Sequence, residues 1–216
     1  MTTEPQSLSL VHRYQPAPHS ALDGSPLLIL LHGVGSNEDD LFGLTPYLDP
    51  RLSVVSARAP FPYGYGGFAW FDVQFTPDGI LFDEAQAEQS IALLTTFIQE
   101  AKAAYAAQKV FLAGFSQGAI MSAGVLLRSP VLIEGTVLMS GRVALTTADR
   151  EAVKGKPVMI AHGTFDDVLP IEYGREAQTL LADLGLDVTY REYPMGHQVS
   201  EESLADIDAW LAARLG

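Results

Sequence analysis

The residues best suited to covalent chemistry are Gly114–Gly118, which read Gly-Phe-Ser-Gln-Gly and match the pattern G-x-S-x-G. The apolar run Val110–Ala113 comes directly before them, and a helical pattern begins at Gly118. A strand, a sharp turn and a helix in this order form a nucleophile elbow, which lifts a serine hydroxyl above the edge of a sheet. Glycines suit such a turn because its backbone is strained and flanking side chains would collide with the strand and helix. We therefore predict that Ser116 attacks a carboxylic ester or thioester.

A serine hydroxyl needs a base, and a histidine base needs an acid to orient it. The chain offers five histidines: His12, His19, His32, His162 and His197. His197 follows the apolar run Val188–Tyr193 and alone completes the chain order serine, acid, histidine. The acid should follow the run Val158–Ala161, where both Asp166 and Asp167 are candidates that spacing does not separate.

Acyl transfer also needs N–H donors for the oxyanion that forms on the carbonyl oxygen. The residue after the nucleophile supplies one donor, which predicts the N–H of Gln117. The loop after an early strand supplies the other, and Leu31–Gly35 (Leu-His-Gly-Val-Gly) occupies that place, with Val34 as the expected donor. The acidic run Glu38–Asp40 is expected at a helix start, where acids complement the helix dipole. With no metal-binding motif in the chain, we predict neither a metal nor another cofactor.

Composition limits the kind of protein that carries these residues. The 216 residues, 48% of them hydrophobic, suit one domain spanning 1–216. A formal net charge of −13 argues against nucleic-acid binding and against docking on anionic lipid, and the lack of cysteine excludes disulfides and thiolate nucleophiles. Met1–Gln6 has no signal-peptide character, and the longest apolar run, Leu27–Leu31, is too short to span a bilayer. We expect a soluble cytoplasmic protein without nucleic-acid partners or stable membrane insertion.

The order of elements indicates the fold that must position these residues. Short apolar runs alternate with helical patterns, and most runs lack the polar alternation of half-exposed strands. The runs are Leu27–Leu31, Leu52–Ser56, Val110–Ala113, Gly135–Met139, Val158–Ala161 and Val188–Tyr193. Helical patterns fit Asp39–Leu48, a segment after Asp83, Gly118–Arg128, Ile171–Leu184 and a final segment after Ser200. This alternation predicts an α/β fold with a mostly parallel central sheet and helices on both faces.

Three local patterns add detail to this fold. Leu8–Tyr14 alternates well enough for an antiparallel edge strand. Asp83 and Gln86 have capping-box spacing at the start of one helix, and Ser200 can cap the last. Pro60–Phe71 is a long aromatic and glycine-rich connection of the kind that forms binding loops or lids. Its Phe68, Trp70 and Phe71 either line an acyl pocket or cover the core beneath the loop.

Taken together, these segments resemble the phospholipase/carboxylesterase family of α/β-hydrolases, from about Leu27 to the end of the chain. The resemblance rests on Leu31–Gly35, Trp70–Asp72, Gly114–Gly118, His162–Asp166 and Gly196–His197. It implies Asp166 as the acid, with Ser116 and His197 completing the triad. Ala119 and Gln198 depart from the family pattern, and the aromatic segment is more similar to small bacterial esterases than to acyl-protein thioesterases.

The leading hypothesis is a carboxylesterase that hydrolyses esters of small acyl groups through an acyl-enzyme on Ser116. The alternatives are a lysophospholipase or acyl-protein thioesterase, which would act on lipid-like acyl esters or thioesters. A non-catalytic binding protein of this fold usually lacks a triad residue, and a dienelactone hydrolase typically uses cysteine as its nucleophile. The sequence keeps all three triad residues and has no cysteine, and it is compatible with a homodimer.

Overall fold

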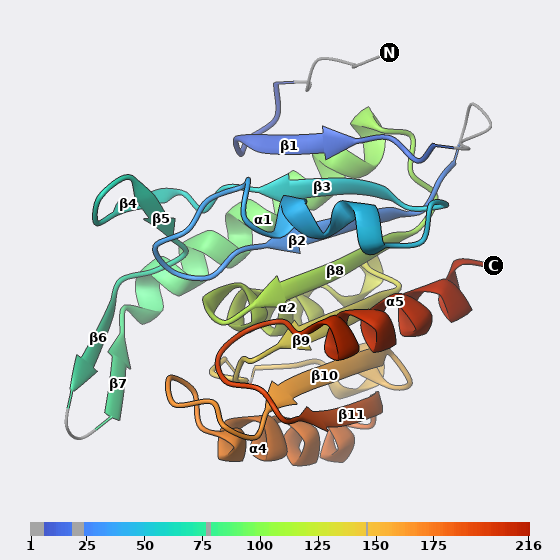
Figure 1. The fold of residues 1–216 in the computed structure, drawn as a ribbon. Coiled ribbons are helices and arrows are strands. Elements are labelled where there is room, and N and C mark those ends of the chain that lie inside the picture. Colours follow the sequence, from blue (N-terminus) through green and yellow to red (C-terminus); the bar gives the residue numbers. More distant parts are fainter. Residues whose placement is uncertain (1–6, 19–23, 77–78, 146) are drawn as a thin grey trace.

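A seven-stranded sheet forms the centre of the computed structural model, which describes residues 7–18, 24–76, 79–145 and 147–216 (Figure 1). Met1–Gln6 and His19, considered above, lie outside the described residues. The strand order is β1-β3-β2-β8-β9-β10-β11. The strands span His12–Gln15 (β1), Leu27–Leu31 (β2), Ser53–Ala57 (β3), Val110–Phe115 (β8), Gly135–Met139 (β9), Pro157–Gly163 (β10) and Asp187–Tyr193 (β11). Neighbouring strands pair in parallel except β1, which pairs antiparallel with β3, so the expected α/β fold and edge strand are confirmed.

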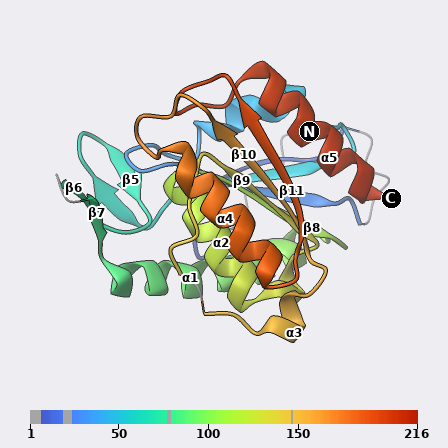
Figure 2. The ribbon, with the colours of Figure 1, turned by 90° about the horizontal axis from the view of Figure 1, so that it is seen from below.

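Helices cover both faces of the sheet (Figure 2). The α-helices span Glu84–Ala104 (α1), Gln117–Arg128 (α2), Arg150–Val153 (α3), Ile171–Asp183 (α4) and Glu201–Leu215 (α5), and 3₁₀ helices span Leu41–Tyr47 (η1) and Pro130–Leu132 (η2). α1, α2 and α4 pack on one face, and α5 and η1 pack on the other. Consecutive side chains of a strand point to opposite faces, so Leu27, Ile29 and Leu31 join one core cluster while Leu28 and Leu30 join the other. This two-sided burial explains the unbroken apolar run of β2.

The start of α1 follows the expected capping pattern in part. The Asp83 side chain accepts a hydrogen bond from the N–H of Gln86 at 3.0 Å. The Gln86 side chain does not return to Asp83, as a full capping box requires; its Oε1 instead accepts the N–H of Asp72 at 2.8 Å. Gln86 thus ties the start of α1 to the aromatic segment. Ser200 does form a capping box, with Ser203, at the start of α5.

The segment expected as the helix Asp39–Leu48 is instead the shorter 3₁₀ helix η1, which contains Pro46. Proline lacks the N–H that a longer helix needs and clashes with the preceding turn. The acids before it do not cap it through their side chains: Asp40 accepts the Ser36 hydroxyl at 2.7 Å, and Glu38 forms an ion pair with Arg58. Glu38–Asp40 thus lies at a helix start as expected, with Asp40 as the N-cap residue of η1, but its side chains form ion pairs and local hydrogen bonds instead of capping the helix.

The aromatic segment Pro60–Phe71, expected to form a binding loop or lid, contains a hairpin of Phe61–Tyr63 (β4) and Gly67–Ala69 (β5). A second hairpin, of Val73–Thr76 (β6) and Gly79–Phe82 (β7), follows it. Both hairpins lie at the carboxyl ends of the parallel strands, and β6–β7 projects away from the sheet (Figure 1). They therefore lie at the edge of the sheet where Ser116 is found.

Among the described helices, none combines the length and apolar character needed to cross a membrane.

The apolar stripe of α1 should carry much of the stability on its side of the sheet. Leu94 is fully buried in the core cluster beneath α1, whereas Gln99 on the same helix is exposed. We expect Leu94→Ala to lower the free energy of unfolding by about 2–5 kcal/mol, because it removes a buried isobutyl group and leaves a cavity. Gln99→Ala should change it by less than about 0.5 kcal/mol. Urea denaturation of both variants tests this, and equal effects would contradict the assignment of this helix face to the core.

Candidate active site

Ser116 lies in a strained turn between β8 and α2. Its φ of 54° and ψ of −116° lie outside the regions that residues with a side chain usually adopt. The turn is held because the Ser116 N–H donates to the Met139 carbonyl at 2.9 Å. A Cβ on Gly114 would lie 2.1 Å from the Gly118 carbonyl oxygen, and one on Gly118 would lie 2.0 Å from the Leu31 carbonyl oxygen. Both glycines are therefore required by the close contact of three backbone segments.

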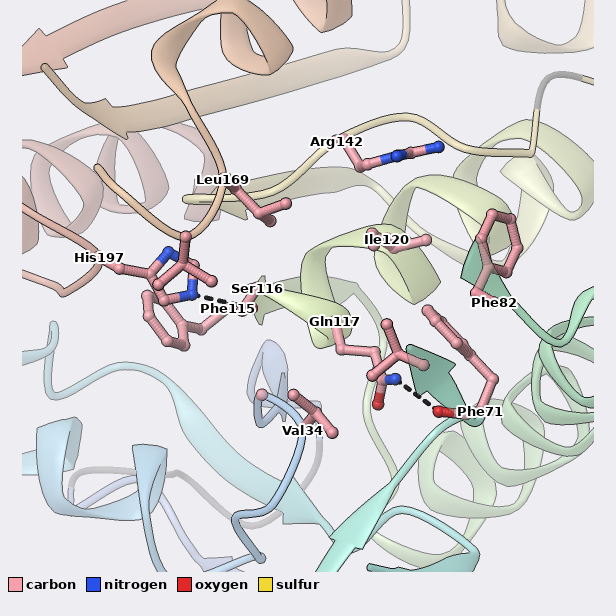
Figure 3. A pocket seen from close by; sticks show the side chains of 13 residues that line it. Val34, Phe71, Phe82, Phe115, Ser116, Gln117, Ile120, Arg142, Leu169 and His197 are labelled. Carbon is pink, nitrogen blue, oxygen red and sulfur yellow. Dashed lines mark hydrogen bonds between the residues drawn. The ribbon is translucent and has the colours of Figure 1, made fainter. Parts of the chain in front are cut away.

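Three polar side chains from separate loops form a continuous hydrogen-bond chain, of which Figure 3 shows the bond between Ser116 and His197. The Ser116 hydroxyl donates to Nε2 of His197 at 2.9 Å. Nδ1 of His197 donates to Oδ2 of Asp166 at 2.8 Å. This order leaves Nε2 of the neutral imidazole free to accept the serine proton. Asp167, the other candidate acid, is exposed and makes no recorded hydrogen bond to His197 within the described part of the chain.

The Asp166 carboxylate is fixed by its own loop. Its Oδ1 accepts the N–H groups of Val168 at 3.0 Å and Leu169 at 2.8 Å, which leaves Oδ2 for His197. The buried His162 braces the same loop, because its Nε2 donates to the Leu169 carbonyl at 2.7 Å. Nε2 of His162 also lies 3.5 Å from Oδ2 of Asp166. The carboxylate therefore faces His197 with little freedom to turn.

The loop after β2 is held from two sides. Gly35 donates its N–H to the Phe68 carbonyl at 2.8 Å, and the Phe68 N–H donates to the Ser36 carbonyl at 2.8 Å. Nδ1 of the buried His32 donates to the Gly33 carbonyl at 2.7 Å, and its Nε2 accepts the Ala59 N–H at 3.0 Å. These bonds use both nitrogens of a neutral ring, and burial lowers the pKa of His32 below its ordinary value. The loop thus presents its Gly33–Val34 backbone to the cleft beside Ser116.

The Gln117 side chain joins the elbow to the aromatic segment. Its Oε1 accepts the Trp70 N–H at 2.7 Å, and its Nε2 donates to the Phe71 carbonyl at 2.7 Å (Figure 3). The Gln117 N–H at the start of α2 and the Val34 N–H have no recorded acceptor among the described residues. Both residues line the same cleft as Ser116 and His197. The N–H groups of Val34 and Gln117 are therefore in positions suited to donate to the same oxygen atom of a bound molecule.

The cleft above Ser116 has a volume of about 180 Å³ and a mostly apolar wall. Of the three aromatic residues singled out in the sequence, Phe71 lines it. Trp70 is fully buried and donates its ring N–H to the His32 carbonyl at 2.9 Å, while the Phe68 ring lies under the Arg58 guanidinium. Neither lines the cleft, so their place in the structure is beneath and beside the β2 loop.

Sequence reasoning missed several residues of the wall. Phe82, Ile120, Arg142 and Leu169 all line the cleft. Arg142 follows β9 by three residues, so the rule that active sites lie at the carboxyl ends of strands could have indicated it. Phe82 reaches the cleft because it lies on the β6–β7 hairpin, which no clear pattern in the sequence indicates. Within the described part of the chain, no group of three or more His, Cys, Asp or Glu side chains could hold a metal ion.

Comparison with known proteins places these features in a wider group. The family model described as Phospholipase/Carboxylesterase matches residues 19–215. Acyl-protein thioesterase 1 of Gibberella zeae is 34% identical over 124 residues, a match that spans 54% of this chain and only about half, 53%, of that protein. Esterase YpfH of Escherichia coli is 31% identical over 188 residues, covering 82% of this chain and 78% of that one. The crystal structure of the Bacillus cereus carboxylesterase superposes with a TM-score of 0.81 at 27% identity, covering 95% of this chain and 94% of that one.

The contact between Gly118 and the end of β2 should tolerate no side chain. Gly118→Ala places a Cβ against backbone rather than against a flexible side chain, so we expect the free energy of unfolding to fall by about 1–3 kcal/mol. Gly43→Ala is the matched control, because a Cβ there meets no atom within 4 Å and should cost less than about 0.5 kcal/mol. Chemical denaturation of both variants measures the difference. Similar stability of the two variants would mean that the elbow relaxes without cost.

The buried neutral His32 should make stability depend on pH. Its pKa is lowered in the folded state from an ordinary value of 6.5, so the unfolded chain binds more protons below that pH. His32 should therefore cost no stability above about pH 6.5 and increasingly destabilise the fold as the pH falls below it, by at most about 1.4 kcal/mol per pH unit. Urea denaturation of wild type and His32→Gln between pH 7.5 and 5.5 tests this. The variant should lose less stability on acidification, and identical pH profiles would rule the effect out.

Proposed function

This chain belongs to the phospholipase/carboxylesterase family and is a serine hydrolase of the carboxylesterase kind; we propose that it cleaves esters of small acyl groups through Ser116, His197 and Asp166. The observation that carries this proposal is the hydrogen-bond chain of 2.9 Å and 2.8 Å that joins these three side chains. Core packing alone does not require a serine on a strained turn to be hydrogen-bonded to a histidine that is itself hydrogen-bonded to a buried aspartate. Acyl transfer does require them.

The reaction begins when Nε2 of His197 takes the Ser116 proton while Oγ attacks the ester carbonyl carbon. The new oxyanion accepts hydrogen bonds from the N–H groups of Val34 and Gln117, which become fully engaged as charge develops. Asp166 stabilises the imidazolium of His197. The imidazolium then gives its proton to the leaving alcohol oxygen, and the acyl group stays on Ser116.

Water completes the cycle through the same groups. His197 removes a proton from a water molecule as the water oxygen attacks the acyl-enzyme carbonyl. The tetrahedral intermediate collapses, Ser116 Oγ leaves and recovers a proton from His197, and a carboxylic acid is released. The strained backbone of Ser116 keeps Oγ above the sheet edge throughout, so neither half of the reaction needs the nucleophile to be repositioned.

The size of the cleft favours a short acyl group. Its volume of about 180 Å³ is smaller than the roughly 300–1,000 Å³ of sites that bury drug-sized ligands. Phe71, Ile120 and Leu169 give it an apolar wall suited to a short hydrocarbon chain. Related proteins are named carboxylesterase or esterase as well as acyl-protein thioesterase, and the small cleft favours the former activity for this chain.

A fluorophosphonate probe tests the role of Ser116 directly, since it phosphonylates activated serines. Wild-type protein should be labelled at Ser116, and Ser116→Ala should not be labelled. Ser129→Ala, a serine at the other end of α2, is the matched control and should react like the wild type. Mass spectrometry of the labelled peptide identifies the site. Equal labelling of Ser116→Ala, or no labelling of folded wild type, would refute the assignment.

A series of para-nitrophenyl esters from acetate to palmitate separates small-ester hydrolysis from the lipid-like alternatives. We expect kcat/KM to be highest for acyl chains of about two to six carbons, which the cleft can enclose, and to fall for longer chains. Palmitoyl thioester and lysophospholipid substrates complete the comparison. A clear preference for long chains, or for thioesters, would assign the site to lysophospholipase or acyl-protein thioesterase activity instead.

A further inference from the structure

Arg142 is the positively charged side chain in the wall of the apolar cleft. It comes after the end of β9, in the segment that follows Ser140 and Gly141. Figure 3 shows its side chain extending toward Phe82, beyond Ile120 and Leu169 as seen from Ser116, on the side away from His197. The mechanism proposed above uses no cation at this place.

The guanidinium of Arg142 is held by aromatic rings rather than by an acid. Its Cζ lies 5.1 Å from the centroid of the Tyr173 ring on α4 and 5.8 Å from that of the Phe82 ring on β7. Among the described residues, no carboxylate lies within 4 Å of it and no hydrogen bond from its nitrogens is recorded. Glu176, which lines the adjacent cavity with Arg142, also lies beyond that limit. Ring faces hold a guanidinium in place and leave its in-plane N–H donors available.

Most other arginines in the described part of this protein of net charge −13 have an acidic partner. Arg150 and Arg191 form no ion pair within that part of the chain but are exposed. Six arginines form ion pairs with a carboxylate: Arg13, Arg51, Arg58, Arg128, Arg175 and Arg214. Arg142 lines an apolar cleft, where a cation loses solvation, yet it has no such partner among the described residues. An anionic group on a bound molecule would supply the missing partner.

The proton transfers of the proposed reaction decide which part of the substrate lies near Arg142. The leaving alcohol oxygen must lie beside Nε2 of His197 to receive its proton. The acyl chain, on the other side of the carbonyl carbon, therefore runs away from His197. Arg142 lies in that direction (Figure 3).

We propose that Arg142 is a specificity-determining residue that binds a carboxylate at the far end of the acyl chain, so that the favoured substrates are esters of short dicarboxylic acids with one carboxylate free. This proposal rests on the proposed function, because it assumes that Ser116 is acylated. Planar guanidinium and carboxylate groups form paired, charge-assisted hydrogen bonds, and the apolar wall strengthens them by excluding water. The methylene groups between the two carbonyl carbons pack against Ile120 and Leu169.

The test compares two substrates of equal acyl length, para-nitrophenyl hexanoate and the mono-para-nitrophenyl ester of adipic acid. Wild type should prefer the adipate ester. Arg142→Gln should lower kcat/KM for the adipate ester by about 10- to 100-fold, the range expected for a charged hydrogen-bonded pair, and change it less than about twofold for hexanoate. Arg142→Lys should retain part of the preference, because it keeps the charge but loses the planar fork. Arg191→Gln, an exposed arginine on β11, is the control for the same change of net charge.

Three results would overturn the proposal. Equal losses for both substrates in Arg142→Gln would mean that Arg142 merely packs between Phe82 and Tyr173. Unchanged rates for both would exclude any role in selection. The third test uses para-acetoxybenzoate, an ester whose carboxylate is on the alcohol side. If Arg142→Gln lowers kcat/KM only for this ester, Arg142 binds an anion on the leaving group rather than on the acyl chain. Fluorophosphonate labelling of Arg142→Gln at the wild-type rate shows that Ser116 chemistry is intact, so a failure of the specificity proposal is distinguished from a failure of the proposed function.

Discussion

The close contact between Gly118 and the Leu31 carbonyl brings the end of β2 and the start of α2 together with no room for a side chain. This contact fixes where α2 begins relative to the sheet. It also fixes the turn that precedes the helix, so Ser116 is held in its strained, positive-φ backbone conformation by packing rather than by a local preference. The loop that follows β2 starts at the same point, which places the Val34 and Gln117 backbones on one side of the serine. A single constraint therefore positions Ser116 and the neighbouring N–H groups.

The remaining residues of the site are positioned by the parallel sheet. The parallel strands β8 and β10 end at the same edge, and β11 beside β10 ends there too, so the loops after them meet although they are far apart in the sequence. Asp166 and His197 come from the loops after β10 and β11. The Asp166 side chain is held by N–H groups of its own loop, whereas the side-chain bonds of His197 run to Asp166 and Ser116. Correct strand order and three well-formed loops therefore bring the hydrogen-bond chain together.

Much of the fold and of the candidate site could be predicted from the sequence, because both depend on local patterns. The buried strands have unbroken apolar runs, and the elbow has glycines at fixed positions. What escaped prediction depends on tertiary partners. Whether Asp166 or Asp167 faces His197 is decided by the N–H groups of Val168 and Leu169, and only the family resemblance indicated the answer. The Gln86 side chain accepts a hydrogen bond from Asp72 instead of completing the capping box. Arg142 is held at the cleft by two aromatic rings from distant elements. Neither contact could be predicted from spacing in the sequence.

The two side-chain hydrogen bonds of Gln117 to the backbone at Trp70 and Phe71 have a consequence for how such a protein can diversify. They join the wall nearest Ser116 to the residue that follows the nucleophile, so a mutation in that part of the wall also disturbs the elbow. The β6–β7 hairpin, which carries Phe82, has no such hydrogen bond to the elbow among the described contacts, whereas the segment after β9, which carries Arg142, packs at Gly141 against Ala119 and the Ser116 carbonyl. Selection can therefore alter the β6–β7 end of the wall over generations without disturbing the turn at Ser116, and new substrate preferences should arise first at that end of the cleft.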